Sequence, residues 1–370
     1  MASASRLPIK AIAGVTALGL ALGAAKVDLK SLLLGVVTGP GNYSRILAIV
    51  VVLANTKSLP FVWHVRVLGA LFSQMYMTKT KPFSATSGSS PYGPSSLFQP
   101  VITSSLAPVA ECDYNLHKSN STYFSDLDVS RSHLVCCLMR QGIQSLMSNP
   151  GQVIMPDGNP SKGKWGIVLG SVQCSFKREI QPYESYEMWS RVLCWDRKWL
   201  YIVTHFVKKG AVRPDGYTLD DGSFASRLFR PRGRPSRKHG KHASEVTNGH
   251  AGAVENIPNK AVFASAISKY VMKLGRLTIH PEVILNASGL LPPKPNGWNT
   301  MSGDKVQSNG AAIVETPATT DGSEWDWTAI EAENARGMKF AEHFAALDDL
   351  AGEFTGADRP ALGVYRDLLW

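Results

Sequence analysis

The stretch CDYNLHKSNSTYFSDLDVSRSHL, residues 112–134, changes character halfway along its length. Its first half places Asp113, His117, Asn120 and Tyr123 at spacings of four, three and three residues. Successive side chains of a strand point to opposite faces, so this spacing does not suit a strand. It suits a turn that delivers polar groups to the N-terminus of a helix, where free backbone N–H groups stabilise anions and polarised carbonyls.

The second half of this stretch predicts a helix from about residue 122 to residue 143. Asp126 and Asp128 lie in its opening turns, where the helix dipole favours negative charge. Apolar residues recur at helical spacing, namely Phe124, Leu127, Leu134, Leu138 and Ile143. The helix is therefore expected to bury one apolar stripe.

Patterns typical of strands lie on both sides of this helix. Apolar and polar residues alternate over 99–109, and strand-like runs follow over 164–180 and 186–208, the last with a hairpin turn at WDRKW (195–199). A long helix with an apolar stripe needs a sheet face to cover, and a strongly curved antiparallel sheet can wrap around it. The order of elements therefore predicts the α+β class and a hotdog fold, in which such a sheet wraps a long central helix.

Composition divides the chain into four expected parts. Residues 1–75 form an apolar, membrane-associating region, and the Ser/Pro/Gly-rich residues 76–97 form a linker. The hotdog domain is expected over 98–290, with a flexible basic insertion at 215–260. A linker and an acidic helical tail occupy 291–370.

Two further helices are expected in the second half of the chain. AVFASAISKYVMKLGRL (261–277) has the pattern of an amphipathic helix that is ended by Gly275 and followed by Pro281. An acidic amphipathic helix is expected near 325–352.

The net charge of +10 depends largely on one run, RLFRPRGRPSRKHGK at 227–241, which holds seven Lys and Arg and no acidic residue. A folded nucleic-acid surface spreads its charge over an element with aromatic residues between, whereas this run is rich in Pro, Gly and Ser. We interpret it as a solvated loop and expect no nucleic-acid partner. Binding of nucleic acid by this run is the competing hypothesis.

Several chemistries lack their sequence signatures. The five cysteines form no C-x-x-C and no zinc-type Cys/His spacing, which favours reduced, buried thiols in a cytosol-facing domain. No G-x-S-x-G elbow and no glycine-rich nucleotide loop occurs. A histidine-rich patch at 238–250 suits at most loose metal binding. We therefore expect no metal and no other cofactor.

The N-terminal region is uncharged and apolar from Ala11 to Ala25, with Arg6 and Lys10 before it. Fifteen helical residues extend about 22 Å, short of the ~30 Å hydrocarbon layer. A cleaved signal peptide, a mitochondrial presequence and a membrane anchor all compete for this segment. We favour the anchor because it also explains the apolar stretches 46–54 and 59–72, of which the first would span or lie in the interface. The expected location is the endoplasmic reticulum or mitochondrial membrane, with the remaining domain facing the cytosol.

The polar motif also resembles a known signature. Asp113-x-x-x-His117-x-x-Asn120-x-x-Tyr123 resembles D-x-x-x-H-x-N-N-x-x-Y of the 4-hydroxybenzoyl-CoA thioesterase branch of hotdog enzymes. The runs at 113–131 and 190–207 resemble, more closely, the thioesterase-like proteins of the THEM six group and their fungal relatives. The resemblance covers roughly 98–290. It departs from the pattern at Ser119, where the family has asparagine, and at Leu116, where glycine is usual.

The resemblance implies hydrolysis of acyl-CoA or a related acyl thioester. Asp113 would act as nucleophile or as general base on the water that attacks the thioester carbonyl. The helix N-terminus at Ser119 and Ser121 would offer backbone N–H groups to the oxyanion, with the Asn120 N–H as the best single donor. His117 would shape the turn or orient Asp113. Tyr123 would line the acyl pocket or form a hydrogen bond across the loop.

The resemblance also implies binding partners. Exposed basic residues would bind the phosphates of CoA, and Arg131, Lys208 and Lys209 are the candidates. A homodimer is expected, with the active site at the subunit interface. Two structural alternatives stay open, since Asp113 can simply cap the following turn and His117 can be a structural histidine. The competing function is a non-catalytic protein of the same fold that binds acyl thioesters or acts as a scaffold on a membrane.

Overall fold

The computed structural model describes residues 31, 34–35, 37–77, 81–82, 93–153, 160–214, 219–220, 261–292 and 325–353. The chain divides into two compact units, Met1–Val62 and Trp63–Trp370. The apolar stretch 11–25, the histidine-rich patch and the whole basic run 227–241 lie outside the described residues, as does all of the insertion 215–260 except residues 219–220.

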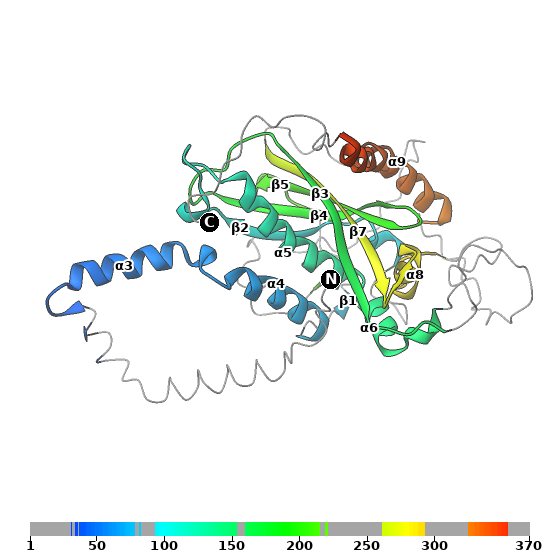
Figure 1. Ribbon diagram of the computed structural model, residues 1–370, viewed down its shortest axis with the longest axis horizontal. Coiled ribbons are helices and arrows are strands. Elements are labelled where there is room, and N and C mark those ends of the chain that lie inside the picture. The colour runs from blue at the N-terminus through cyan, green and yellow to red at the C-terminus, as the bar shows by residue number, and fades with distance from the viewer. Residues whose placement is uncertain are drawn as a thin grey trace, which may run out of the picture. The chain divides into compact units, whose positions relative to one another are not determined.

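One six-stranded antiparallel sheet forms the centre of the second unit (Figure 1). Its strand order is β2-β4-β5-β7-β3, and β8 pairs with the end of β7. The strands are β2 (Val101–Leu106), β3 (Trp165–Phe176), β4 (Ser185–Trp195), β5 (Trp199–Lys208), β7 (Val262–Leu274) and β8 (Leu277–Ile279). The strands predicted over 99–109 and 164–180 and the hairpin over 186–208 are thus confirmed.

Register shifts interrupt the strand pairing at three places. The first lies between Leu169 and Ser171 in the pairing of β3 with β7, the second between Val192 and Cys194 in the pairing of β4 with β5, and the third between Phe206 and Val207 in the pairing of β5 with β7. Such bulges add twist to a strand. Gly170 lies at the first bulge, where a Cβ atom would come within 2.4 Å of the Trp199 ring, so a side chain there would displace that ring.

The central helix α5 (Asn120–Leu138) packs on one face of this sheet, against β2 and β4. Leu127 and Leu134 are fully buried, and the hydroxyl oxygen of Ser130 lies 2.8 Å from that of Ser190 on β4. The helix ends earlier than residue 143 because the backbone leaves helical geometry at Met139. A second helix, α6 (Arg140–Ser148), follows at once.

The segment 261–277 is β7, so the prediction of an amphipathic helix there was wrong. β7 lies between β5 and β3, and buried residues occur on both of its faces. A strand covered on both faces loses the simple alternation of apolar and polar residues that marks a half-exposed strand. The remaining pattern of apolar residues resembled a helical stripe.

The second cover of the sheet is α9 (Trp327–Ala345), which lies on the face opposite α5 (Figure 1). Adjacent residues of β4 show the two sides, since Ser190 contacts α5 and Arg191 lies 3.5 Å from Glu333 on α9. The approach is close, because a Cβ atom on Gly337 would come within 2.4 Å of the Leu193 carbonyl oxygen. The C-terminal helix therefore forms an outer layer on the domain.

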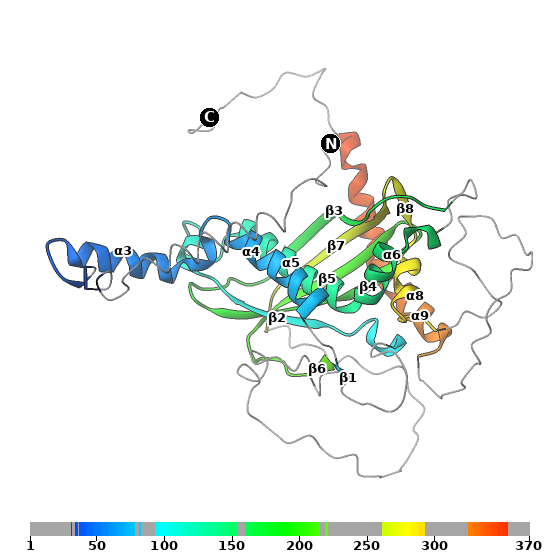
Figure 2. The ribbon, with the colours of Figure 1, turned by 90° about the horizontal axis from the view of Figure 1, so that it is seen from below.

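Smaller elements complete the fold. Helices α6 and α8 (Pro281–Ala287) pack together at one end of the sheet (Figure 2), and β1 (Lys81–Pro82) and β6 (Leu219–Asp220) form a separate two-stranded sheet. Short 3-10 or π turns complete the described chain, namely Thr56–Ser58, Ser73–Met77, Pro94–Ser96, Val109–Glu111, Pro150–Gln152 and Ala346–Glu353.

The apolar stretches 46–54 and 59–72 fall in α3 (Asn42–Ala54) and α4 (Val62–Phe72). Among the residues that the structure describes, no helix combines the length and the apolarity that a membrane span requires. The 13 residues of α3 extend about 20 Å.

Candidate active site

The loop that carries Asp113 is closed by hydrogen bonds at its base. Cys112 and Lys118 form an antiparallel bridge, and the Ser119 N–H donates to the Glu111 carbonyl at 2.8 Å. Within the loop, the Asp113 N–H donates to the His117 carbonyl at 2.9 Å. The turn needs a left-handed residue, and Leu116 provides it with φ of +63°. Leucine thus adopts the conformation for which glycine is favoured.

The side chains of Asp113 and His117 lie side by side in this loop. His117 Nδ1 is 3.7 Å from Asp113 Oδ1, and His117 Nε2 is 3.3 Å from Oε1 of the exposed Glu179. Asp113 Oδ1 also accepts a hydrogen bond from the Asn115 N–H at 2.9 Å. The carboxylate therefore caps its own turn, as the structural alternative required, and remains partly exposed beside the imidazole.

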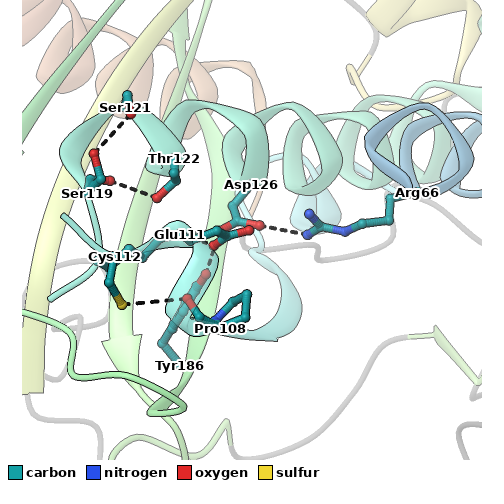
Figure 3. Close-up of polar contacts among 10 residues, drawn as sticks. Arg66, Pro108, Glu111, Cys112, Ser119, Ser121, Thr122, Asp126 and Tyr186 are labelled. Carbon is teal, nitrogen blue, oxygen red and sulfur yellow. Dashed lines mark hydrogen bonds and ion pairs between the residues drawn. The ribbon is translucent and has the colours of Figure 1, made fainter. Parts of the chain in front are cut away.

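Helix α5 begins at Asn120, directly after the loop, with Ser119 at its N-cap. The Thr122 hydroxyl donates to the Ser119 carbonyl at 2.7 Å, and the hydroxyl oxygens of Ser119 and Ser121 lie 3.0 Å apart (Figure 3). The N–H groups of Asn120 and Ser121 belong to the first helical turn, which offers them no carbonyl partner. The loop that holds Asp113 and His117 thus leads directly into the N-terminus of α5.

Tyr123 is buried in the core beneath this helix end. Its ring packs edge-on against Phe176 and Phe206, with centroid distances of 5.0 and 4.9 Å. Burial, with weaker contributions from Cys174 and Asp126, raises the pKa of the phenol. The neutral phenol ring is therefore part of the apolar core, and its contact with an acyl chain stays a prediction.

The three basic candidates divide into two groups. Arg131 is 2% exposed, and its guanidinium donates to Asp128 Oδ1 and Ser268 Oγ, both at 2.6 Å. The prediction that Arg131 is an exposed phosphate ligand was wrong, because the side chain joins α5 to β7 inside the domain. Lys208 is 65% exposed and 3.6 Å from Glu184 Oε1, and Lys209 is also exposed, so both stay candidates for binding anions.

A buried group of charges next to the loop was not anticipated from the sequence. Lys118 Nζ lies 2.7 Å from Glu111 Oε2 and 2.9 Å from Asp126 Oδ2. Asp126 also accepts hydrogen bonds from Arg66 at 2.7 Å and from the Tyr186 hydroxyl at 2.5 Å (Figure 3). Burial and the neighbouring Asp126 raise the pKa of Tyr186, so its hydroxyl remains a neutral donor. Only the presence of Glu111 just before the motif and of Lys118 within it hinted at this group.

Comparisons with known proteins identify the proteins that this chain is similar to. The model of the thioesterase-like superfamily matches residues 107–220. Thioesterase poxG of Penicillium oxalicum is 35% identical over 323 residues, covering 86% of this chain and 89% of that protein. "Probable thioesterase atnL" of Emericella nidulans is 32% identical over 334 residues, covering 89% and 92%. The solved structure of YbaW from Escherichia coli aligns with 51% of this chain and 96% of its own at 9% identity and a TM-score of 0.31. With its closed polar loop, central helix and these relatives, the chain belongs to the thioesterase-like superfamily.

Proposed function

We propose that this protein hydrolyses acyl-CoA or a related acyl thioester, with Asp113 as the general base for the attacking water. The observation that carries the proposal is the hydrogen-bonded loop, which presents the Asp113 carboxylate and the His117 imidazole immediately before the N-terminus of α5. The matching thioesterases span most of the chain and support the same reaction class.

Each step of the proposed reaction uses a group in this loop or helix end. Asp113 takes a proton from water as the oxygen attacks the thioester carbonyl. The N–H groups of Asn120 and Ser121, at the positive end of α5, stabilise the resulting oxyanion. The C–S bond then breaks, and the CoA thiolate takes up the proton that Asp113 received, which restores the carboxylate. His117, within 3.7 Å of Asp113, orients the carboxylate.

A second candidate function follows from the hydrogen bond between the Asn115 N–H and Asp113 Oδ1. In this alternative Asp113 only shapes the turn, and the protein binds acyl thioesters without cleaving them. The two functions differ in whether the charge of Asp113 is needed.

The substitution Asp113→Asn separates the two functions, because an asparagine oxygen can still accept the hydrogen bond from Asn115. The full-length protein would be incubated with acyl-CoAs of several chain lengths, and free CoA would be measured with a thiol reagent. We expect release by the wild type and a loss of at least about 100-fold in kcat for Asp113→Asn. Asp128→Asn, which neutralises a carboxylate of α5 that is bound to Arg131, is the control and should retain kcat. Tight binding without release of CoA would favour the binding protein.

We also propose that two copies of the chain pair through β3. Within the described sheet, β3 is an end strand with β7 as its neighbour, and Val168 and Leu169 are exposed on it. An exposed apolar end strand is a ready template for pairing with a second strand. Val168→Lys should convert a dimer to a monomer in sedimentation measurements, and an unchanged mass for this variant would contradict the pairing.

Association with a membrane surface is proposed for the N-terminal part. The large apolar side chains of α3 from Leu47 to Leu53 are all exposed, namely Leu47, Ile49, Val50, Val51, Val52 and Leu53. An exposed apolar helix can lie in the interface without crossing the bilayer. The wild type should float with phospholipid vesicles, whereas Leu47→Glu/Val50→Glu should not. Flotation of both proteins alike would contradict the role of α3.

A further inference from the structure

We propose that the buried charge clamp of Arg66, Glu111, Lys118, Asp126 and Tyr186 positions the Asp113 loop on α5, and that the rate of hydrolysis depends on it. The inference rests on the proposed function and extends it to residues that do not touch the reacting atoms. These five are positioning residues.

Lys118 joins the two ends of the Asp113 loop. Its side chain is 0% exposed, and its ammonium binds Glu111 at 2.7 Å and Asp126 at 2.9 Å. Glu111 precedes the loop and Lys118 ends it, so this ion pair joins the two ends around Asp113. Because Asp126 lies within α5, the same ammonium also ties the loop to the helix whose N-terminus follows it.

Asp126 is in turn held by two other elements. Arg66 from α4 binds Oδ1 at 2.7 Å, and Tyr186 from β4 donates to Oδ2 at 2.5 Å. The carboxylates of Glu111 and Asp126 therefore face the two cations Lys118 and Arg66, which balances the buried charges. Figure 3 shows Arg66 and Tyr186 reaching Asp126 from different sides. The loop, α4, α5 and β4 thus meet at one carboxylate.

The arrangement does more for geometry than for stability. The attraction within a buried ion pair often does not offset the free energy that desolvation of the two charges costs. Apolar side chains of similar volume often give equal or greater stability. Fixed charges do restrict the relative positions of their partners. A displacement of about 1 Å of a catalytic group can lower a rate by about 100-fold. Arg66 lies outside the residues 107–220 that the superfamily model matches, and Lys118 occupies a position that the signature leaves open.

The chain offers a matched control for Lys118. Lys269 is also buried, at 2% exposed, and its ammonium binds Asp348 Oδ1 at 2.6 Å between two aromatic rings. It faces the α9 side of the sheet, whereas its neighbour Ser268 faces α5. Lys118→Met and Lys269→Met therefore each remove the charge of a buried lysine that is paired with a carboxylate, one at the loop and one on the opposite face of the sheet, although Asp348 itself is 58% exposed.

The test compares both variants in the full-length protein at a temperature where both are folded. We expect Lys118→Met to lower kcat by about 10- to 100-fold with KM changed less than about threefold, and Lys269→Met to retain kcat. Hydrogen exchange of the amides from 113 to 119 should accelerate in Lys118→Met alone. The double variant Lys118→Met/Glu111→Gln rebalances the charge and should recover thermal stability but not kcat.

The outcomes distinguish the clamp from the proposed function. Wild-type kcat and wild-type exchange in Lys118→Met would overturn the clamp alone, as would recovery of kcat in the double variant. Absence of CoA release by the wild type would overturn the proposed function, while the exchange measurement would still decide the clamp. If Lys118→Met does not fold, Arg66→Met, which keeps the bond between Lys118 and Glu111, should lower kcat by about threefold or more, with rescue by Arg66→Lys. Unchanged kcat in Arg66→Met would then overturn the clamp.

Discussion

The left-handed residue of the active-site loop provides a direct test of the loop geometry. Leu116 has φ of +63° and a side chain that is 68% exposed. The left-handed conformation costs a residue with a Cβ atom about 1–2 kcal/mol, and glycine avoids this cost. Glycine also makes the unfolded chain more flexible, which offsets about 0.4–1 kcal/mol. Leu116→Gly is therefore expected to raise the free energy of unfolding by about 1 kcal/mol, or the Tm by roughly 2–4 °C for a domain of this size.

Leu116→Ala is the control for this prediction. Alanine removes the same exposed side chain but keeps the Cβ atom, so it should not relieve the backbone. Urea unfolding followed by circular dichroism would give the free energy of each variant. A glycine variant no more stable than the alanine variant would refute the argument, because the strain would then be absent or the loop would have another conformation.

Four further predictions concern the core. Leu127→Ala, which truncates a fully buried side chain of α5, should lower the free energy of unfolding by about 2–5 kcal/mol in urea. Arg131→Met should lower the free energy of unfolding by about 1–3 kcal/mol, because its buried partners lose their donor, and it should leave the KM for acyl-CoA unchanged. A raised KM without loss of stability would instead indicate that Arg131 binds the substrate. Burial, reinforced by nearby basic side chains, lowers the pKa of His205. The imidazole therefore takes up its proton at a higher pH in the unfolded chain than in the folded protein. Stability should therefore fall as the pH drops from about 6.5 towards the folded pKa, and the slope should be smaller in His205→Gln. Burial raises the pKa of Cys136 to about 11, so about one thiol in a thousand is ionised at pH 8; iodoacetamide should label it slowly in the native protein and rapidly in urea.

The parts of the fold that the sequence revealed are those with a local pattern. Apolar and polar residues alternate along β4 and β5, which a short turn joins. The polar motif predicted the start of α5 to within two residues. β7 has no such pattern, because α5 covers one face of the sheet and α9 the other. A residue near position 270 cannot indicate a cover that is supplied by residues 327–345.

The candidate site divides in the same way. Asp113, His117 and Asn120 are near neighbours in sequence, so their spacing alone brought them together. Asp126 meets Arg66 and Tyr186 across 60 residues in each direction, and no local signal announces such partners. Arg131 was misassigned for the related reason that the sequence does not show whether an arginine on a helix faces solvent or a distant serine.

The outer layer made by α9 has a consequence for the order of synthesis. Asn334, whose side chain binds the backbone of Trp195, is joined to the growing chain 139 residues after it. Until then the apolar cluster of Leu193, Tyr201 and their neighbours has no cover from Phe344. A chain whose synthesis stops before residue 327 would therefore expose this apolar cluster, and the exposed surface would bind chaperones or cause aggregation.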